Sequence, residues 1–170
     1  QSEVRIGHLG VSRTHPDSFS ITVMNAVLGG LFSSRLNLNL REAHGYTYGA
    51  SSAFDWRREA GPFVVGTAVA SDVTAAAIQE TLKEIDRMRA EPISESELSL
   101  ATSYLEGVFP IRYETTAAIA AALATLAVYG LPADWYDTYR ARMRAVPLAA
   151  VFAAARASVP PGSLPLVIVG

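Results

Sequence analysis

The segment that decides the fold is residues 46–69, which read YTYGASSAFDWRREAGPFVVGTAV. Alternate positions in its first half carry aromatic or small residues, and in an extended chain these share one face. They are Tyr46, Tyr48, Ala50, Ser52, Phe54 and Trp56. A polar stretch at 57–61 then leads into an apolar run at 63–69. Two such runs around a charged turn predict an antiparallel β-hairpin.

Two further strands are expected outside the hairpin. Alternation indicates one over about 3–12 and another over 164–169, where Pro165 indicates an edge strand or a late start. Helix signals fill the rest of the chain. The expected helices run from Thr14–Asp17 to Gly29, from Ser33 or Ser34 to Gly45, from Asp72 or Thr74 to Pro92, from Ser94 to about Pro110, and over 115–129, 133–144 and 147–158.

Three of these helix predictions have particular consequences. The alternation at 36–40 leaves a strand open as an alternative to the short second helix. Ser94 and Glu97 form a capping box for a helix whose buried side carries Leu98, Ala101, Tyr104, Leu105 and Val108. The Ala- and Leu-rich stretch 115–129 is expected to be buried on most sides. Because strands and helices are segregated, the predicted class is α+β, with an antiparallel or mixed sheet and helices packed on one face.

Composition narrows the classes of function. The chain has 170 residues, of which 50% are hydrophobic and 18% charged, so we expect one folded domain over residues 1–170 rather than a disordered chain. A net charge of -2 argues against nucleic acid as a partner, and the absence of cysteine excludes disulfides and thiolate sites. The longest apolar run, 117–128, is shorter than the roughly 18 residues of a membrane span, so none is expected. The start at Gln1, without Met or a leader, suggests an excised piece.

Few residues offer catalytic chemistry. The three histidines are not spaced as metal ligands, and the serines after Gly29-Gly30 lack the turn of a hydrolase nucleophile. The densest polar cluster lies at 37–48, where Arg41 in the last turn of a helix and Tyr48 beyond the Gly45 turn can point into one cleft. A guanidinium and a phenol can both donate to a carbonyl oxygen or an oxyanion. The alternative that both residues are structural stays open, because the helix dipole favours Arg at the C-terminal end of a helix and tyrosines in strands commonly pack against neighbours.

At these residues the chain resembles a known family. The blocks Leu28-Gly-Gly-Leu-Phe-Ser-Ser-Arg-Leu36 and Leu40-Arg-Glu-Ala-His-Gly-Tyr-Thr-Tyr48 are similar to those of the C-terminal-type, non-zinc-binding domain of the pitrilysin-like (M16) zinc metallopeptidases. That family includes insulin-degrading enzyme and mitochondrial processing peptidase, with bacterial relatives. The resemblance extends to the closing Ile168-Val169-Gly170, and Tyr46 departs from it where an aliphatic residue is common.

The resemblance implies half of an active site. In the family, two homologous α+β domains face each other across a chamber, and one carries a His-x-x-Glu-His zinc motif that this chain lacks. Arg41 and Tyr48 match the pair that binds the substrate backbone and stabilises the tetrahedral intermediate. We therefore expect no metal, cofactor or activity in this domain alone, a homologous zinc-bearing partner domain in the same or another polypeptide, and an unstructured peptide as substrate. The alternative is a non-peptidase scaffold like the core subunits of respiratory complexes. The periplasm and the cytoplasm both stay open.

Overall fold

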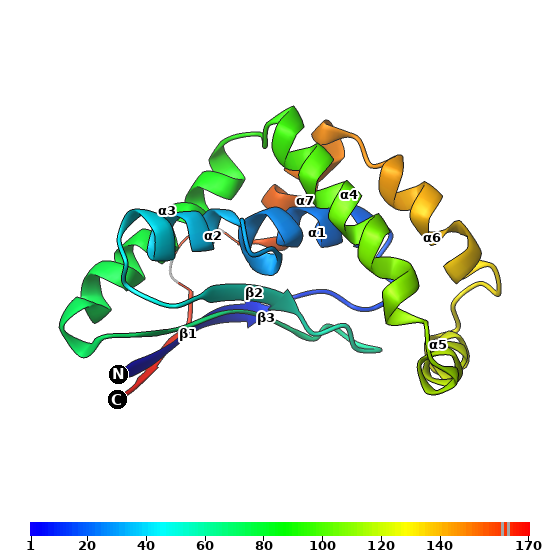
Figure 1. The fold of residues 1–170 in the computed structure, drawn as a ribbon, viewed down its shortest axis with the longest axis horizontal. Helices are drawn as coiled ribbons and strands as arrows, with labels where there is room; N and C mark the ends of the chain where they lie inside the picture. Colours follow the sequence, from blue (N-terminus) through cyan, green and yellow to red (C-terminus); the bar gives the residue numbers. More distant parts are fainter. Residues whose placement is uncertain (161, 163) are drawn as a thin grey trace.

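The computed structural model describes residues 1–160, 162 and 164–170, which form one sheet and a layer of helices (Figure 1). The strands are β1 (Ser2–Leu9), β2 (Ala50–Phe54), β3 (Pro62–Val69) and β4 (Leu166–Val169). The helices are α1 (Ser18–Asn25), α2 (Arg35–Asn37), α3 (Thr74–Ala90), α4 (Glu95–Arg112), α5 (Thr116–Tyr129), α6 (Trp135–Arg144) and α7 (Leu148–Ser158). The π-helical turns Ala26–Gly30 and Leu38–Ala43 extend α1 and α2, and the 3-10 turn Ser71–Val73 precedes α3.

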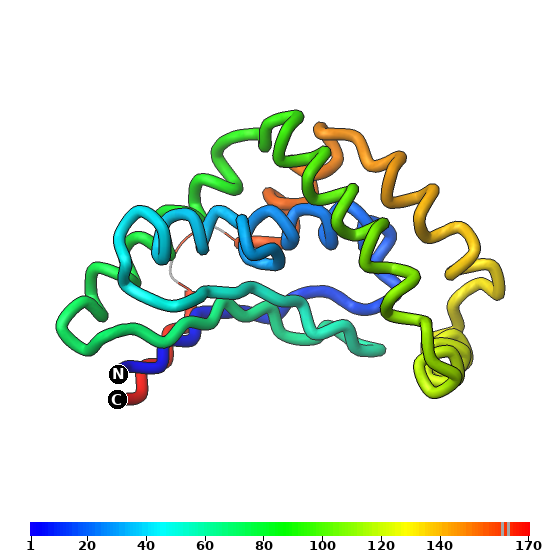
Figure 2. Tube along the Cα trace, viewed as in Figure 1, coloured from blue at the N-terminus to red at the C-terminus, as the bar shows by residue number. Residues whose placement is uncertain are grey.

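The four strands pair antiparallel in the order β2-β3-β1-β4. Ile6 lies opposite both Val65 of β3 and Leu166 of β4, so the first strand and the last lie side by side and the two chain ends are neighbours (Figure 2). The predicted hairpin is confirmed, although its first strand begins at Ala50 rather than at 46. The predicted edge position of the strand after Pro165 is confirmed as well.

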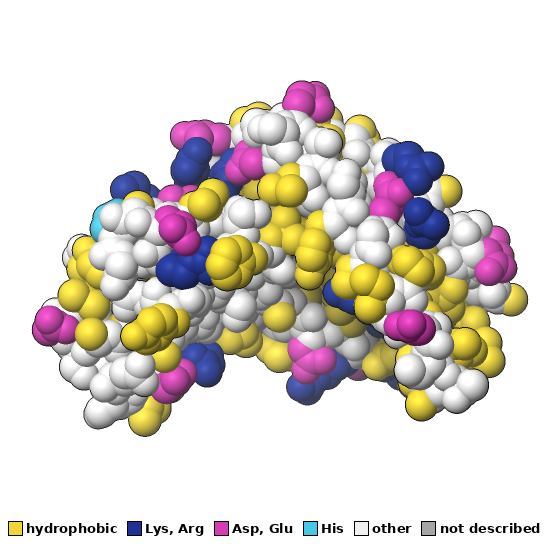
Figure 3. Space-filling model, in the orientation of Figure 1, with side chains coloured by type: hydrophobic (Ala, Val, Ile, Leu, Met, Phe, Trp, Pro, Cys, Tyr) yellow, Lys and Arg dark blue, Asp and Glu magenta, His cyan; other side chains and the backbone are white. Residues whose placement is uncertain are grey.

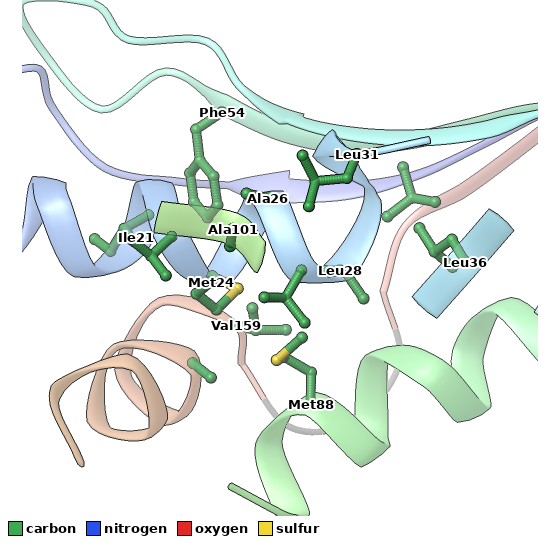
Figure 4. Packing of buried hydrophobic residues seen from close by; sticks show 14 of the residues in the cluster. Ile21, Met24, Ala26, Leu28, Leu31, Leu36, Phe54, Met88, Ala101 and Val159 are labelled. Atoms are coloured by element: carbon green, nitrogen blue, oxygen red, sulfur yellow. The ribbon is translucent and has the colours of Figure 1, made fainter. Parts of the chain in front are cut away.

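The helices other than α5 lie on one face of the sheet, which confirms the predicted α+β class (Figure 1). The inward side chains of β1, such as Val4 and Ile6, are buried beneath them, because alternate residues of a strand point to opposite faces. Met24 and Leu28, from the first helix and its π-helical end, lie at the centre of the core and Met88 of α3 packs beside them (Figure 4). The packing of the helical layer on the sheet therefore depends on the stretch that runs from Ser18 to α2.

Helix ends follow the sequence signals closely. The Ser34 side chain caps α2, so the 36–40 segment is helical and the strand alternative is wrong. Ser94 and Glu97 form both hydrogen bonds of the predicted capping box. The signal before α1 acts differently, since Asp17 makes no side-chain cap and its backbone N–H instead donates to His15 Nδ1 at 3.2 Å.

Two predictions about the second half of the chain are wrong. α4 continues through Pro110 to Arg112, and Tyr104, assigned to its buried side, is exposed. α5 is exposed over most of its surface, with Ala122 its only buried residue and Leu123 59% exposed. It projects from the end of the helical layer, where hydrophobic side chains gather at the surface (Figure 3). Propensity favours a helix there, but it does not say what the helix packs against.

Within the described residues, length and composition alone would allow the stretch Ser18–Ala43, or the bent pair formed by α4 and α5, to cross a membrane. The prediction of no membrane span rested only on the longest apolar run, 117–128, and did not identify Ser18–Ala43 as long and apolar enough to span. Within the stretch, 72% of the most apolar window is buried inside the protein, as in the core helix of a folded domain. The angle of 111° between α4 and α5 breaks the second stretch.

Candidate functional site at the connection between α2 and β2

The helix that carries Arg41 is held at its start by a buried ion pair. Arg35 at the first position of α2 donates from Nε to Glu97 Oε1 at 2.6 Å and from Nη2 to Glu97 Oε2 at 3.0 Å. Glu97 also accepts from the backbone N–H of Ser94 at 2.7 Å. Partial burial pushes the pKa of Glu97 upward, but the bonds from Arg35 and Ser94 outweigh it and lower the pKa from 4.5 to about 2. The carboxylate is therefore charged throughout the neutral range.

A buried asparagine ties the same helix to the sheet. The Asn37 side-chain amide donates to the carbonyl oxygen of Leu31 at 3.1 Å, and its Oδ1 accepts from the backbone N–H of Ala50 at 2.9 Å. Asn25 similarly donates to the carbonyl oxygen of Ser52 at 3.0 Å. Asn37 and Asn25 thus form hydrogen bonds with backbone groups on the open edge of β2. The bond from Asn37 holds the helix, four residues before Arg41, against the start of the strand, two residues after Tyr48.

Close packing of the π-helical end of α1 against β2 requires a glycine at position 29. A Cβ on Gly29 would lie 2.5 Å from the backbone nitrogen of Ser52. The π-helical end of the first helix can approach β2 only because this position has no side chain. Gly29 therefore sets how closely the segment containing Phe32 and Ser34 approaches the sheet.

Arg41 lies in the last turn of the π-helical segment with its side chain 16% exposed. Its Cζ sits 3.6 Å from the ring centroid of Phe32, which is itself 79% exposed. Nε donates to Glu42 Oε1 at 2.8 Å, and Nη2 lies 3.4 Å from the carbonyl oxygen of Phe32. Stacking and hydrogen bonding thus orient the guanidinium at the surface.

Tyr48 follows a tight turn. Gly45 has φ +65°, a left-handed conformation that glycine adopts without strain, and it ends the helix as predicted. The chain then joins the sheet only at Ala50, because Thr47 Oγ1 bonds to the carbonyl oxygen of Ala68 at 2.7 Å and accepts from the Gly49 N–H at 3.1 Å. Tyr48 is 94% exposed, and its hydroxyl has no hydrogen-bond partner among the described residues.

The structure therefore places Arg41 and Tyr48 on the same helix-to-strand connection, near the start of β2 (Figure 1). No hydrogen bond joins them within the described part of the chain. A hollow of about 300 Å³ beside the connection is lined by Tyr48 and by Gly45–Thr47, but Arg41 is not part of its wall. In residues 1–160, 162 and 164–170, no group of three or more His, Asp or Glu side chains is placed to hold a metal ion.

Comparison with known proteins identifies the family. The family model of the peptidase M16 inactive domain matches residues 1–105. The chain belongs to the M16 peptidases. Over 119 residues, the M16 chain is 27% identical to an uncharacterised zinc protease of Streptomyces coelicolor, covering 70% of this chain but 26% of that protein. It therefore spans about a quarter of the length of this relative.

Solved structures share the fold over nearly all of this M16 domain. A peptidase M16 inactive domain from Pseudomonas fluorescens superposes with a TM-score of 0.91 at 23% identity, covering 98% of this chain and 40% of that one. A chain of complex III2 from Candida albicans superposes with a TM-score of 0.83 at 14% identity, covering 98% of this chain and 42% of that one. The chain is thus an inactive domain of zinc protease-like proteins, and its fold also occurs in a respiratory complex.

Sequence reasoning missed two residues that support the candidate site. Phe32 was part of the recognised motif, but nothing in its spacing indicated that Arg41 would stack on it. Asn37 was included in the polar cluster, but its bonds to Leu31 and Ala50 depend on a strand that joins the helix only in three dimensions.

Proposed function

We propose that residues 1–170 form the non-catalytic domain of an M16 zinc peptidase, and that Arg41 and Tyr48 complete an active site built on a homologous zinc-bearing partner. In this proposal the two side chains bind the backbone of a peptide substrate and stabilise the transition state. The family match and the zinc protease relative support the general role. The specific role of the pair rests on the exposure of Tyr48 and on the hydrogen-bonding chemistry of both residues.

The exposure of Tyr48 is the observation that carries the proposal. A tyrosine kept for packing would bury its ring, yet this residue is 94% exposed beside a strand whose inward side chains are buried. Its hydroxyl is free to donate to a group outside the chain. A tyrosine in this position has no evident role in the stability of the fold.

Arg41 supports the proposal in a different way. The helix dipole accounts for a cation at this end of the helix, but not for a guanidinium stacked at 3.6 Å on an exposed phenylalanine. The stack and the bond to Glu42 restrict the side chain, which stays 16% exposed, so less conformational entropy is lost when it binds an oxygen acceptor. Arg41 keeps donor groups available for a substrate carbonyl.

The proposed mechanism divides the work between the domains. A zinc ion on the partner would supply an activated water for attack on the scissile carbonyl. Arg41 would donate a hydrogen bond from its guanidinium to a backbone carbonyl of the peptide. Tyr48 would donate its phenolic proton in a hydrogen bond to the oxygen that gains negative charge in the transition state. This chain would contribute positioning and charge stabilisation, and no metal ligand.

The second candidate is a scaffold domain without proteolysis. It is favoured by the match to a chain of a respiratory complex, which has the same fold at 14% identity. A scaffold has no requirement for a donor pair directed toward a substrate. The two candidates therefore differ in what happens when the pair is removed.

The test combines this chain with a zinc-bearing M16 partner and follows cleavage of an unstructured peptide. Tyr48→Phe and Arg41→Ala are each expected to lower kcat/KM by about a hundredfold, which is typical when one oxyanion donor is removed. The matched controls are Tyr104→Phe and Arg5→Ala, which alter exposed residues outside the α2–β2 connection. Gel filtration establishes that each variant still forms the complex.

The outcomes separate the two candidates. Loss of turnover in the Arg41 and Tyr48 variants alone, with the complex intact, supports the peptidase role. A complex that assembles and cleaves equally well with either variant refutes the role of the pair. A complex that assembles with the zinc-loaded partner but cleaves no peptide, even before any substitution, favours the scaffold.

A further inference from the structure

A second polar pocket lies at the other end of β2, away from Tyr48. It has a volume of about 150 Å³ and lies between α1, the end of α4 and α6, at the end of the helical layer from which α5 projects (Figure 1). The wall residues that could bind a ligand are basic or aromatic: Arg13, Trp56, Arg112, Tyr113, Trp135 and Tyr139. None of these residues belongs to the proposed peptidase site.

Positive charge at this pocket is not neutralised by the chain. Arg13 and Arg112 line it, and Arg142 stacks on two of its wall residues, with its Cζ 4.0 Å from the Phe19 ring centroid and 4.8 Å from the Trp135 ring centroid. None of the three arginines forms an ion pair within the described residues, whereas Arg35, Arg57 and Arg144 each pair with a carboxylate. No Asp or Glu is among the described residues of the wall.

The pocket also offers neutral donors. Trp135 is buried, and its indole Nε1–H has no acceptor in the described part of the chain. Burial and the neighbouring Tyr136 raise the pKa of Tyr113 to about 12. Burial raises the pKa of Tyr139 as well, against the lowering effect of Arg112 and Arg13. Both phenols therefore keep their protons at neutral pH and can donate.

We propose that this pocket binds a carboxylate group of a polypeptide. Unpaired guanidinium groups and two phenols line the pocket without a competing acid, which suits an anion with several acceptor oxygens. The volume of about 150 Å³ is well below the roughly 300–1,000 Å³ of pockets that enclose a whole small molecule. It fits the end of an acidic side chain, or a carboxyl terminus, with a few waters.

The position of the pocket relates it to Tyr48. Trp56 lies two residues after the end of β2, and Tyr48 lies two residues before its start. The chain between them covers at most about 26 Å, since an extended residue advances about 3.3 Å. An extended peptide of about eight residues could therefore contact both places. The pocket would bind its carboxylate whether or not the Arg41–Tyr48 pair acts in peptidolysis.

The tryptophans provide a direct assay. The chain contains two, Trp56 and Trp135, and both line the pocket, so its intrinsic fluorescence reports on occupancy. We would titrate the 170-residue chain with three otherwise identical acetylated peptides. One has a single Glu and an amidated end, one has Gln and an amidated end, and one has Gln and a free carboxyl terminus.

We expect a fluorescence change with the Glu peptide at a concentration at least about tenfold below that needed for the amidated Gln peptide, because a hydrogen-bonded charge strengthens binding by about that factor. The third peptide distinguishes the two sources of carboxylate. If it binds and the Glu peptide does not, the ligand is a carboxyl terminus. Equal responses to all three, or none to any, would overturn the proposal.

Variants locate the response. Arg112→Gln, which alters an exposed residue at the end of α4, and Arg13→Gln should each weaken carboxylate binding about tenfold. Arg140→Gln, an exposed arginine on α6 outside the pocket wall, should leave it unchanged. Circular dichroism checks that each variant is folded. An unchanged affinity in folded Arg112→Gln and Arg13→Gln, or an equal loss in Arg140→Gln, contradicts the assignment.

Discussion

Replacement of Glu97 by Gln should destabilise the chain, because it leaves a buried arginine without its counterion. The amide retains an oxygen for the Ser94 cap but has no charge, so the buried Arg35 loses its counterion. The fall in the pKa of Glu97 from 4.5 to about 2 corresponds to at most about 3 kcal/mol. Because the carboxylate is 30% exposed, solvent screening reduces that contribution to about 2 kcal/mol.

The assay is thermal unfolding followed by circular dichroism at neutral pH. A loss of about 2 kcal/mol predicts a fall in Tm of roughly 4–8 °C for a chain of this length. Glu95→Gln, in the first turn of the same helix but without an ion pair, is the matched control and should change stability by less than about 0.5 kcal/mol. The double replacement Arg35→Met with Glu97→Leu should recover much of the loss, because it removes the unpaired charge.

The pH dependence tests the same ion pair independently. The folded chain holds the pKa of Glu97 below its unfolded value, so the stabilisation is complete above about pH 4.5 and is lost as the pH falls toward 2. Glu97→Gln should therefore flatten the stability curve between pH 4.5 and 2. A variant curve parallel to that of the unaltered chain across this range, or a Tm equal to that of Glu95→Gln, would show that the ion pair contributes nothing.

Three further predictions concern the site and its support. Asn37→Ala leaves the Ala50 N–H and the Leu31 carbonyl without their partner, so chemical denaturation should show a loss of about 2–4 kcal/mol, and a loss below 1 kcal/mol would contradict the role of this side chain. Gly29→Ala puts a methyl group 2.5 Å from the Ser52 nitrogen and should lower Tm clearly, whereas Gly107→Ala, which has open space, should raise or preserve it. Leu123→Gln on exposed α5 should change the stability of the isolated chain by less than about 0.5 kcal/mol, and a larger loss would mean that this face packs within the chain.

Local signals predicted most of the fold because they act between near neighbours in the chain. The Ser34 and Ser94 caps, the Gly45 turn and the alternation in β2 each involve residues only a few positions apart. The prediction that α5 is buried is wrong for the opposite reason. Its composition is the same whether its apolar side chains face this core or lie at the surface, so no periodicity could decide between them.

The candidate site shows where local pattern stops being informative. The alternation placed Tyr48 in a strand with Ala50 and Phe54, on a face that is buried in the hairpin. Thr47 prevents this, because its hydroxyl bonds to Ala68 and to Gly49 and keeps the chain out of the sheet until Ala50. The consequence is an exposed phenol where the pattern predicted a packed one. Tyr48 therefore does not pack as an ordinary strand residue within the described chain, and its role toward a substrate stays a prediction.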